Sequence, residues 1–207
     1  MTTKLGPLVA LAAKTLDATL DSATQANIAT WLARLEEWNA RMDLTAARSP
    51  EELVDLMLAD ALVLAGCVPR GRNIVDVGTG AGAPGLALAL VRPDLHVTLI
   101  EPLGKRASFL RTVIGEVRRV DIAIERARGQ AAAREHRVWD VALSRATLPA
   151  AAWLDLATNL VNVGGTIWVF LAHEDAPAHA RAVIETELAY EWPLTRAHRR
   201  AIGYRTV

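Results

Sequence analysis

The chain of 207 residues is 52% hydrophobic and 22% charged, which fits one large globular domain, or a domain with a small extension, and excludes a disordered chain. Its formal net charge is zero, so the molecule as a whole has no attraction for nucleic acid, although a local basic patch would suffice to bind RNA. Because it has one cysteine, no signal peptide and no apolar span of membrane length, we expect a cytoplasmic protein without disulfides or a membrane partner.

The first seventy residues are predicted to be helical. An Ala/Leu-rich stretch covers about 8–20, and apolar residues at spacings of three and four over 28–38 are typical of an amphipathic helix. Ser49-Pro50 begins a third helix, with serine as the cap and proline at the first helical position. We therefore expect residues 1–70 to form a helical extension that packs on a core domain of residues 71–207.

From residue 72 onwards the hydrophobic pattern alternates between strands and helices. The strands are predicted at about 73–78, 96–101, 121–126, 139–144 and 166–172. The helices are predicted at about 84–91, 104–117, 129–135, 150–161 and 176–189. Such alternation predicts an α/β fold, with a parallel sheet and helices on both of its faces. The tail, 188–207, alternates apolar residues and is predicted to add a closing antiparallel hairpin.

The turn predicted after the first strand contains Asp76 and then three glycines at alternate positions, Gly78, Gly80 and Gly82. Glycine lacks a Cβ and adopts positive φ, so such a turn lets the backbone approach a ligand closely. The helix that follows presents free N–H groups to an anionic part of that ligand. The pattern therefore predicts a site for a nucleotide-type cofactor.

Two cofactors compete for this turn. Gly80, Gly82 and Gly85 also match the dinucleotide spacing G-x-G-x-x-G, which is a weak signal by itself. Glu101, at the end of the second strand, is placed to accept hydrogen bonds from the ribose hydroxyls of either cofactor. Asp76 separates them, because its carboxylate would attract the methionine amine of S-adenosylmethionine and repel a pyrophosphate. The turn resembles that of Rossmann-like S-adenosylmethionine-dependent methyltransferases, and we expect that cofactor.

Further segments extend this likeness from about residue 25 to 170. They are Trp38-Asn39, Asp43-Leu44-Thr45-Ala46, Pro84-Gly85, Arg92-Pro93-Asp94, Leu103-Gly104-Lys105-Arg106, Phe109-Leu110-Arg111 and Ser144-Arg145-Ala146. In this order and spacing, the chain resembles the bacterial small-subunit ribosomal RNA guanine-N7 methyltransferase family, also called the glucose-inhibited division protein B family. The resemblance implies a Rossmann-like methyltransferase sheet, S-adenosylmethionine as methyl donor and ribosomal RNA as partner.

The resemblance also implies roles for particular residues. It places cofactor contacts at Gly78, Ala83, Ala127, Arg128 and Arg145. The backbone near Gly78 and Ala83 would hold the methionine part, and the pair 127–128 would flank the adenine. Arg145 would close the site, and we expect it to take part in catalysis.

The chain departs from the family pattern at several positions on the substrate side. Leu56-Met57 stands where the family usually has Arg-His, Asp60-Ala61 where it has Asp-Ser, and Leu171-Ala172 near its usual Lys-Gly. The cofactor turn is kept. Three functions therefore stay open: methylation of guanine N7 in small-subunit ribosomal RNA, which leads, methylation of a small molecule or peptide by an enzyme of the same descent, and a binding module that keeps the cofactor without transferring its methyl group.

The acceptor decides whether a general base is needed. Guanine N7 has a free lone pair and needs none, whereas a hydroxyl or an acidic carbon does. His173 and Glu174 are the candidates, since they follow the fifth strand at the edge where open α/β sheets bind ligands; the other interpretation is a polar strand exit that caps the next helix. Lys105 and Arg106 follow the second strand, either as RNA phosphate contacts or as a solvated helix face. His173 and His179 lack a third ligand at a useful spacing, so no metal site is expected.

Overall fold

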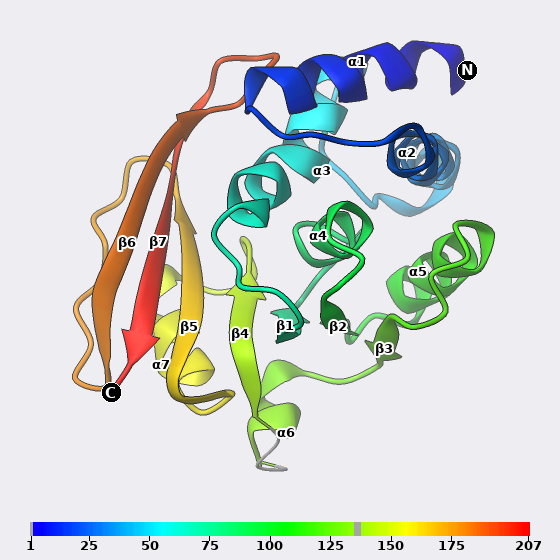
Figure 1. The fold of residues 1–207 in the computed structure, drawn as a ribbon. Coiled ribbons are helices and arrows are strands. Elements are labelled where there is room, and N and C mark those ends of the chain that lie inside the picture. Colours follow the sequence, from blue (N-terminus) through cyan, green and yellow to red (C-terminus); the bar gives the residue numbers. More distant parts are fainter. Residues whose placement is uncertain (1, 135–137) are drawn as a thin grey trace.

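The computed structural model describes residues 2–134 and 138–207. Its centre is a seven-stranded sheet in the order β3-β2-β1-β4-β5-β7-β6 (Figure 1). The strands are β1 (Asn73–Val77), β2 (His96–Ile100), β3 (Ala123–Glu125), β4 (Trp139–Ser144), β5 (Val161–Leu171), β6 (Ala182–Glu191) and β7 (His198–Thr206). Neighbours among β1 to β5 pair in parallel, and β7 runs antiparallel to both β5 and β6. The predicted α/β class and the closing hairpin are confirmed.

Helices cover both faces of this sheet (Figure 1). They are α1 (Thr2–Thr15), α2 (Ser22–Met42), α3 (Pro50–Ala65), α4 (Gly85–Val91), α5 (Gly104–Glu116), α6 (Gly129–Arg134) and α7 (Ala150–Ala157). Successive residues of a strand point to opposite faces, so Ile74 joins the core under α1 to α5 while Val75 joins the core under α6 and α7. A parallel strand that is buried on both faces consists mostly of consecutive apolar residues, and this pattern made the interior strands predictable from the sequence.

The N-terminal helices pack on the sheet domain through the apolar residues that predicted them. The side chains of Trp31 and Leu32 are fully buried, and α1 to α3 share one hydrophobic core with α4 and α5. Ser49 Oγ accepts the N–H of Glu52 at 3.1 Å, so α3 begins with the predicted serine cap. The division of the chain at residue 70 stays a prediction.

Two predicted helices differ from the structure. The helix predicted at 176–189 is wrong throughout, because 176–181 is loop and turn and 182–191 is the edge strand β6, paired with β7 from Ala182 to Glu191. Its Ala, Glu and Leu residues suit a helix, but long-range pairing overrides that local preference. The helix predicted at 150–161 ends at Ala157, and β5 begins at Val161 instead of 166. The helix predicted at 129–135 is α6 up to Arg134, and residue 135 lies outside the described residues.

Candidate active site

The turn between β1 and α4 carries the three alternating glycines, whose φ angles are 71° at Gly78, 60° at Gly80 and 113° at Gly82. Residues with side chains rarely adopt such angles, which accounts for glycine at each position. A Cβ built at Gly80 would come no closer than 4.0 Å to any atom beyond its chain neighbours. A Cβ at Gly82 would lie 2.8 Å from Leu86 Cβ. The turn therefore opens to a cavity at Gly80 and packs against the core at Gly82.

Contacts from two other elements hold this turn. Glu101 follows β2 and is only 1% exposed; its Oε2 accepts the N–H of Gly80 at 3.0 Å and its Oε1 that of Leu103 at 2.8 Å. Trp31 on α2 donates its indole Nε1–H to the carbonyl oxygen of Ala81 at 3.0 Å. The glycine turn is thus shaped both by the sheet and by the N-terminal helices.

Asp76 lies directly beneath the turn and is fully buried. Its Oδ2 accepts the N–H of Gly85 at 2.8 Å, whereas Oδ1 and the neighbouring Thr79 Oγ1 make no hydrogen bond of ordinary geometry to a described residue. Burial disfavours the charged form and raises the pKa of Asp76 from 3.8 to about 6. A hydrogen-bond donor or a cation brought close to these oxygens would relieve an unfavourable arrangement.

A cavity of about 560 Å³, here called the turn cavity, opens above the glycines. Five segments line it: the loop before α3, α3 itself, the glycine turn, the loop after β2 with the first turn of α5, and the loop after β4. Its lining residues include Thr45, Gly78, Gly80, Ala83, Glu101, Arg106, Arg145 and Thr147. The volume lies within the range of small-molecule sites.

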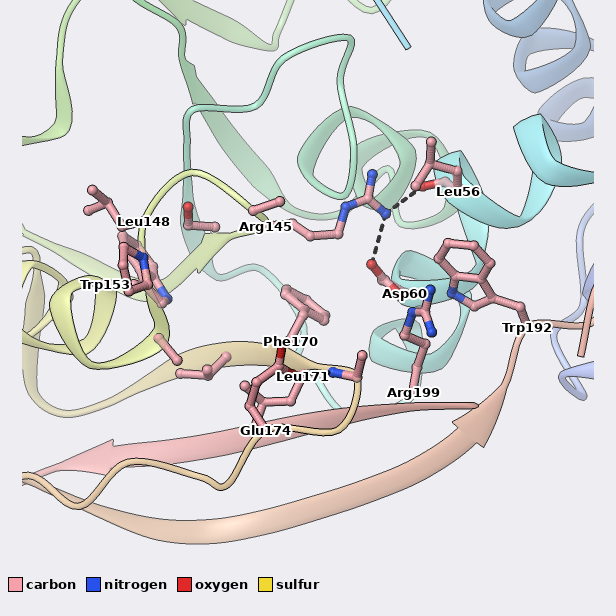
Figure 2. A pocket seen from close by; sticks show the side chains of 16 residues that line it. Leu56, Asp60, Arg145, Leu148, Trp153, Phe170, Leu171, Glu174, Trp192 and Arg199 are labelled. Carbon is pink, nitrogen blue, oxygen red and sulfur yellow. Dashed lines mark hydrogen bonds and ion pairs between the residues drawn. The ribbon is translucent and has the colours of Figure 1, made fainter. Parts of the chain in front are cut away.

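A second cavity of about 600 Å³, here called the outer cavity, is shown in Figure 2 and borders the first. Both are lined by Leu56, Arg145 and Ala146. Arg145 Nη1 contacts Asp60 Oδ2 at 2.9 Å and also donates to the carbonyl oxygen of Leu56. Its Nε and Nη2 donate to none of the described residues, so these groups are available to an anionic ligand.

The structure brings part of the predicted site together. The predicted residues that line the turn cavity are Gly78, Gly80, Ala83, Glu101, Arg106 and Arg145. Asp76 and Gly82 lie beneath it, as described above. Lys105, the other predicted substrate contact, points elsewhere, since its Nζ donates to the carbonyl oxygen of Met42 at 3.1 Å. The roles assigned to these residues stay predictions.

Three other predicted residues do not line either cavity. Ala127 is partly buried against the core under α6 and α7, and Arg128 is exposed just before α6. His173 is exposed after β5, where its backbone N–H donates to Glu174 Oε2 at 3.1 Å. Glu174 lines the outer cavity, so of the two candidates for a general base only Glu174 borders a cavity.

Sequence reasoning missed the far wall of the outer cavity. Trp192 and Arg199, on either side of the β6–β7 turn, line this cavity, and the Arg199 guanidinium lies 4.1 Å from the Trp192 ring centroid. Tyr190 O–H donates to Asp60 Oδ1 at 2.6 Å, which is the same carboxylate that pairs with Arg145. The sequence hinted at this wall only through the arginines of the tail, 188–207, and their spacing did not indicate which of them face the cavity.

The described residues contain no group of His, Cys, Asp and Glu side chains arranged to hold a metal ion. Nor does any helix in the described ranges have the length and apolarity needed to cross a membrane.

The strand order and the glycine turn above an acid define a Rossmann-like methyltransferase fold. Solved structures share it. An O-methyltransferase from Bacillus cereus in complex with SAH aligns with a TM-score of 0.63 at 17% identity, over 98% of this chain and 100% of that one. An O-methyltransferase described as putative, from Klebsiella pneumoniae, aligns with a TM-score of 0.62 at 15% identity, over 86% and 90% of the two chains.

The chain belongs to the family described as rRNA small subunit methyltransferase G, whose profile matches residues 24–191. Two relatives carry the name Ribosomal RNA small subunit methyltransferase G. The one from Anaeromyxobacter dehalogenans is 35% identical over 188 residues, 87% of each chain. The one from Methylobacillus flagellatus is 38% identical over 139 residues, 67% of this chain and 66% of the relative. The protein is thus a methyltransferase, and the family predicted from its motifs is confirmed.

Proposed function

We propose that the protein transfers a methyl group from S-adenosylmethionine to N7 of a guanine in small-subunit ribosomal RNA. The observation that carries the proposal is the pair of cavities that meet at Arg145, one built on the glycine turn and one beside it. Such a pair can hold a donor and an acceptor next to each other. The ribosomal RNA substrate in this proposal is taken from the names of the relatives. The proposal includes a cytoplasmic location, where bacterial ribosomes work.

The residues of the turn cavity fit S-adenosylmethionine. Open space at Gly80 accepts a ligand against the backbone, and Glu101 lies beside Gly80 with lone pairs for ribose hydroxyls. Beneath the turn, Asp76 Oδ1 makes no hydrogen bond of ordinary geometry to a described residue, and its carboxylate would attract the methionine amine. Arg145 Nε and Nη2, which donate to none of the residues in the described ranges, suit the methionine carboxylate.

When bound, S-adenosylmethionine supplies an activated methyl group: a carbon–nitrogen bond forms to N7, and the carbon–sulfur electron pair stays on a neutral thioether. The protein has no proton to remove from N7, so its residues act by alignment. Arg145, fixed by Asp60 and the Leu56 carbonyl, sets the boundary at which the two ligands meet. The exposed His173 has no part in this scheme.

A small-molecule or peptide acceptor is the second candidate. The lining of the outer cavity is mostly apolar, and Leu56, at the shared wall, stands where the family usually has a basic residue. A cavity of this kind would also accept an apolar small molecule.

The test is methyl incorporation into unmodified small ribosomal subunits, with tritium-labelled S-adenosylmethionine and the purified protein. We expect label in the small-subunit RNA, at one guanine that becomes sensitive to chain scission after reduction, as N7-methylated guanine does. Label in a small molecule or peptide and none in RNA would favour the second candidate. If the protein fails to bind S-adenosylmethionine in calorimetry, the donor itself is wrong.

A further inference from the structure

The outer cavity has a wall that comes from far along the chain. The cavity extends from the end of β4 and the Arg145–Ala146 loop to the turn between β6 and β7, with Phe170 of β5 between them (Figure 2). Because it shares Arg145 with the turn cavity, a ligand in it would lie next to whatever the turn cavity holds.

The β6–β7 turn is fixed onto α3 by a buried carboxylate. Asp55 is fully buried and accepts the N–H of Leu194 at 3.1 Å, the N–H of Thr195 at 2.7 Å and the Thr195 hydroxyl at 2.7 Å. A second acid of α3, Asp60, accepts the Tyr190 hydroxyl. Buried acids are costly unless their hydrogen bonds are made, so these contacts specify one position for the turn. The position of Trp192 in the wall of the cavity follows from this anchoring.

The chemistry of the outer cavity suits a flat ring with polar edges. Trp153, Phe170 and Trp192 supply aromatic surface in the walls. Glu174 supplies the charge: its Oε2 accepts the N–H groups of Ala172 at 2.9 Å and His173 at 3.1 Å. Its own backbone N–H and these two lower the pKa of Glu174, so the carboxylate is ionised at neutral pH. Oε1 accepts no hydrogen bond from a described residue.

We propose that the outer cavity binds the acceptor guanine, turned out of its RNA stack, with its N1–H and N2–H₂ edge toward Glu174. This inference rests on the function proposed above. Glu174 Oε1, the oxygen that accepts nothing from a described residue, has lone pairs for two adjacent donors, which guanine has on this edge and adenine does not. Enzymes that modify a base commonly extrude it into such a pocket.

Glu174 also favours the reaction. Methylation at N7 gives the base a positive charge, and a fixed carboxylate attracts that charge more strongly than it attracts the neutral base. An interaction that strengthens toward the transition state raises kcat as well as affinity. The pair of Arg145 and Asp60 at the shared wall is neutral in sum, so it does not oppose this charge.

The first test compares Glu174→Gln with Glu185→Gln, a matched control at an exposed position of β6 that lines neither the outer cavity nor the turn cavity. We expect kcat/KM for small-subunit RNA to fall about 5- to 150-fold in Glu174→Gln, the range for loss of a bidentate base contact. Glu185→Gln should stay within about twofold of the wild type. The affinity for S-adenosylmethionine should be unchanged in both variants.

A nucleotide exchange identifies the contact. Inosine keeps N7 and N1–H but lacks the N2 amino group, so RNA with inosine at the target position should be a poorer substrate for the wild type. For the Glu174→Gln variant, replacing guanosine by inosine should lower kcat/KM only slightly, because this variant already lacks the carboxylate that pairs with the amino group. Equal and additive losses would mean that Glu174 acts elsewhere.

The second test does not depend on turnover. The indole N–H signal of Trp192, assigned by its absence in Trp192→Phe, should shift when 7-methylguanosine 5′-monophosphate is added, and shift at lower concentration than with guanosine 5′-monophosphate. Glu174→Gln should abolish this preference. The inference would be overturned if the wild type methylates RNA, Glu174→Gln does so with the same kinetics, and the Trp192 signal does not shift. The proposed function would then still stand. If RNA is not methylated, the proposed function fails, and absence of the Trp192 shift then removes the guanine site as well.

Discussion

The three glycines of the turn after β1 have different surroundings, although the sequence presents them as equivalent. A Cβ at Gly78 would lie 2.4 Å from Thr147 Oγ1, and one at Gly82 would meet Leu86 and Trp31. Substitutions at these two positions would disturb the protein itself. At Gly80 the nearest atoms, Arg106 Nη1 and Gly78 O, are 4.0 Å away. Gly80 is therefore the position at which a side chain would enter the cavity without first colliding with the fold.

We predict that Gly80→Ala weakens binding of S-adenosylmethionine by more than its effect on folding explains. Alanine at φ 60° costs about 1–2 kcal/mol of stability, and its methyl group would also occupy ligand space. Gly71→Ala is the matched control, because Gly71 has φ 68° with open space and lies outside the turn cavity. Calorimetric titration beside thermal melts should show similar melting temperatures and a loss of affinity in Gly80→Ala alone. Equal affinities in the two variants would contradict a cofactor at this turn.

The raised pKa of Asp76 leads to a second prediction about a single residue, the pH dependence of cofactor binding. Burial raises this pKa to about 6, so the carboxyl is ionised at pH 7 and becomes neutral as the pH falls below about 6. If the ionised form attracts the methionine amine, the affinity for S-adenosylmethionine should decline between pH 7 and pH 5, by up to about tenfold per pH unit below 6. Asp76→Asn, which keeps an acceptor for the Gly85 N–H, should bind weakly at all these pH values and show a flat profile. A wild-type affinity that is the same at pH 5 and pH 7 would remove Asp76 from the binding site.

At the scale of helices and strands, the parts of the site that could be predicted are those formed by short stretches of neighbouring residues in the sequence. The glycine turn, Glu101 and Arg145 each follow a buried strand, and carboxyl ends of parallel strands meet at one edge of the sheet. The wall formed by Trp192 and Arg199, and the Tyr190 hydrogen bond that ties this region to α3, were not predictable. The contacts of this region with α3 join residues 130 or more positions apart, and the strand β6 that carries Tyr190 reads locally as a helix.

We predict that Tyr190→Phe reduces RNA methylation through Asp60 and Arg145. The change removes the 2.6 Å hydrogen bond to Asp60 Oδ1, which leaves that buried carboxylate oxygen without this partner and lets Asp60 shift together with the Arg145 that it pairs with. Tyr204→Phe is the control, because it removes a 2.7 Å hydrogen bond to the Pro177 carbonyl on the opposite face of the sheet. Both should cost about 1–3 kcal/mol in urea unfolding. The fall in kcat/KM should be confined to Tyr190→Phe; an equal fall in both would mean that it reflects stability alone.

At the scale of the whole molecule, the N-terminal helices contact both walls of the site. Trp31 of α2 donates to Ala81 in the glycine turn, and Asp55 of α3 holds the β6–β7 turn. The buried side chains of α1 to α3 belong to the same core as α4, α5 and one face of the sheet. The helical extension predicted from the sequence is thus part of what positions the site, even though the cofactor motif begins only after it.

We therefore predict that the protein unfolds in one cooperative transition. A shared core couples the extension to the sheet, so neither part can lose its packing without exposing the apolar face of the other. Differential scanning calorimetry should give equal calorimetric and van't Hoff enthalpies for the full chain. The fragment 71–207 should fail to bind S-adenosylmethionine, because the glycine turn would lose the indole donor of Trp31 and the core beneath Leu86 would be open to water. Two separate transitions, or a fragment 71–207 that folds and binds the cofactor with the affinity of the full chain, would show instead that the extension is an independent domain.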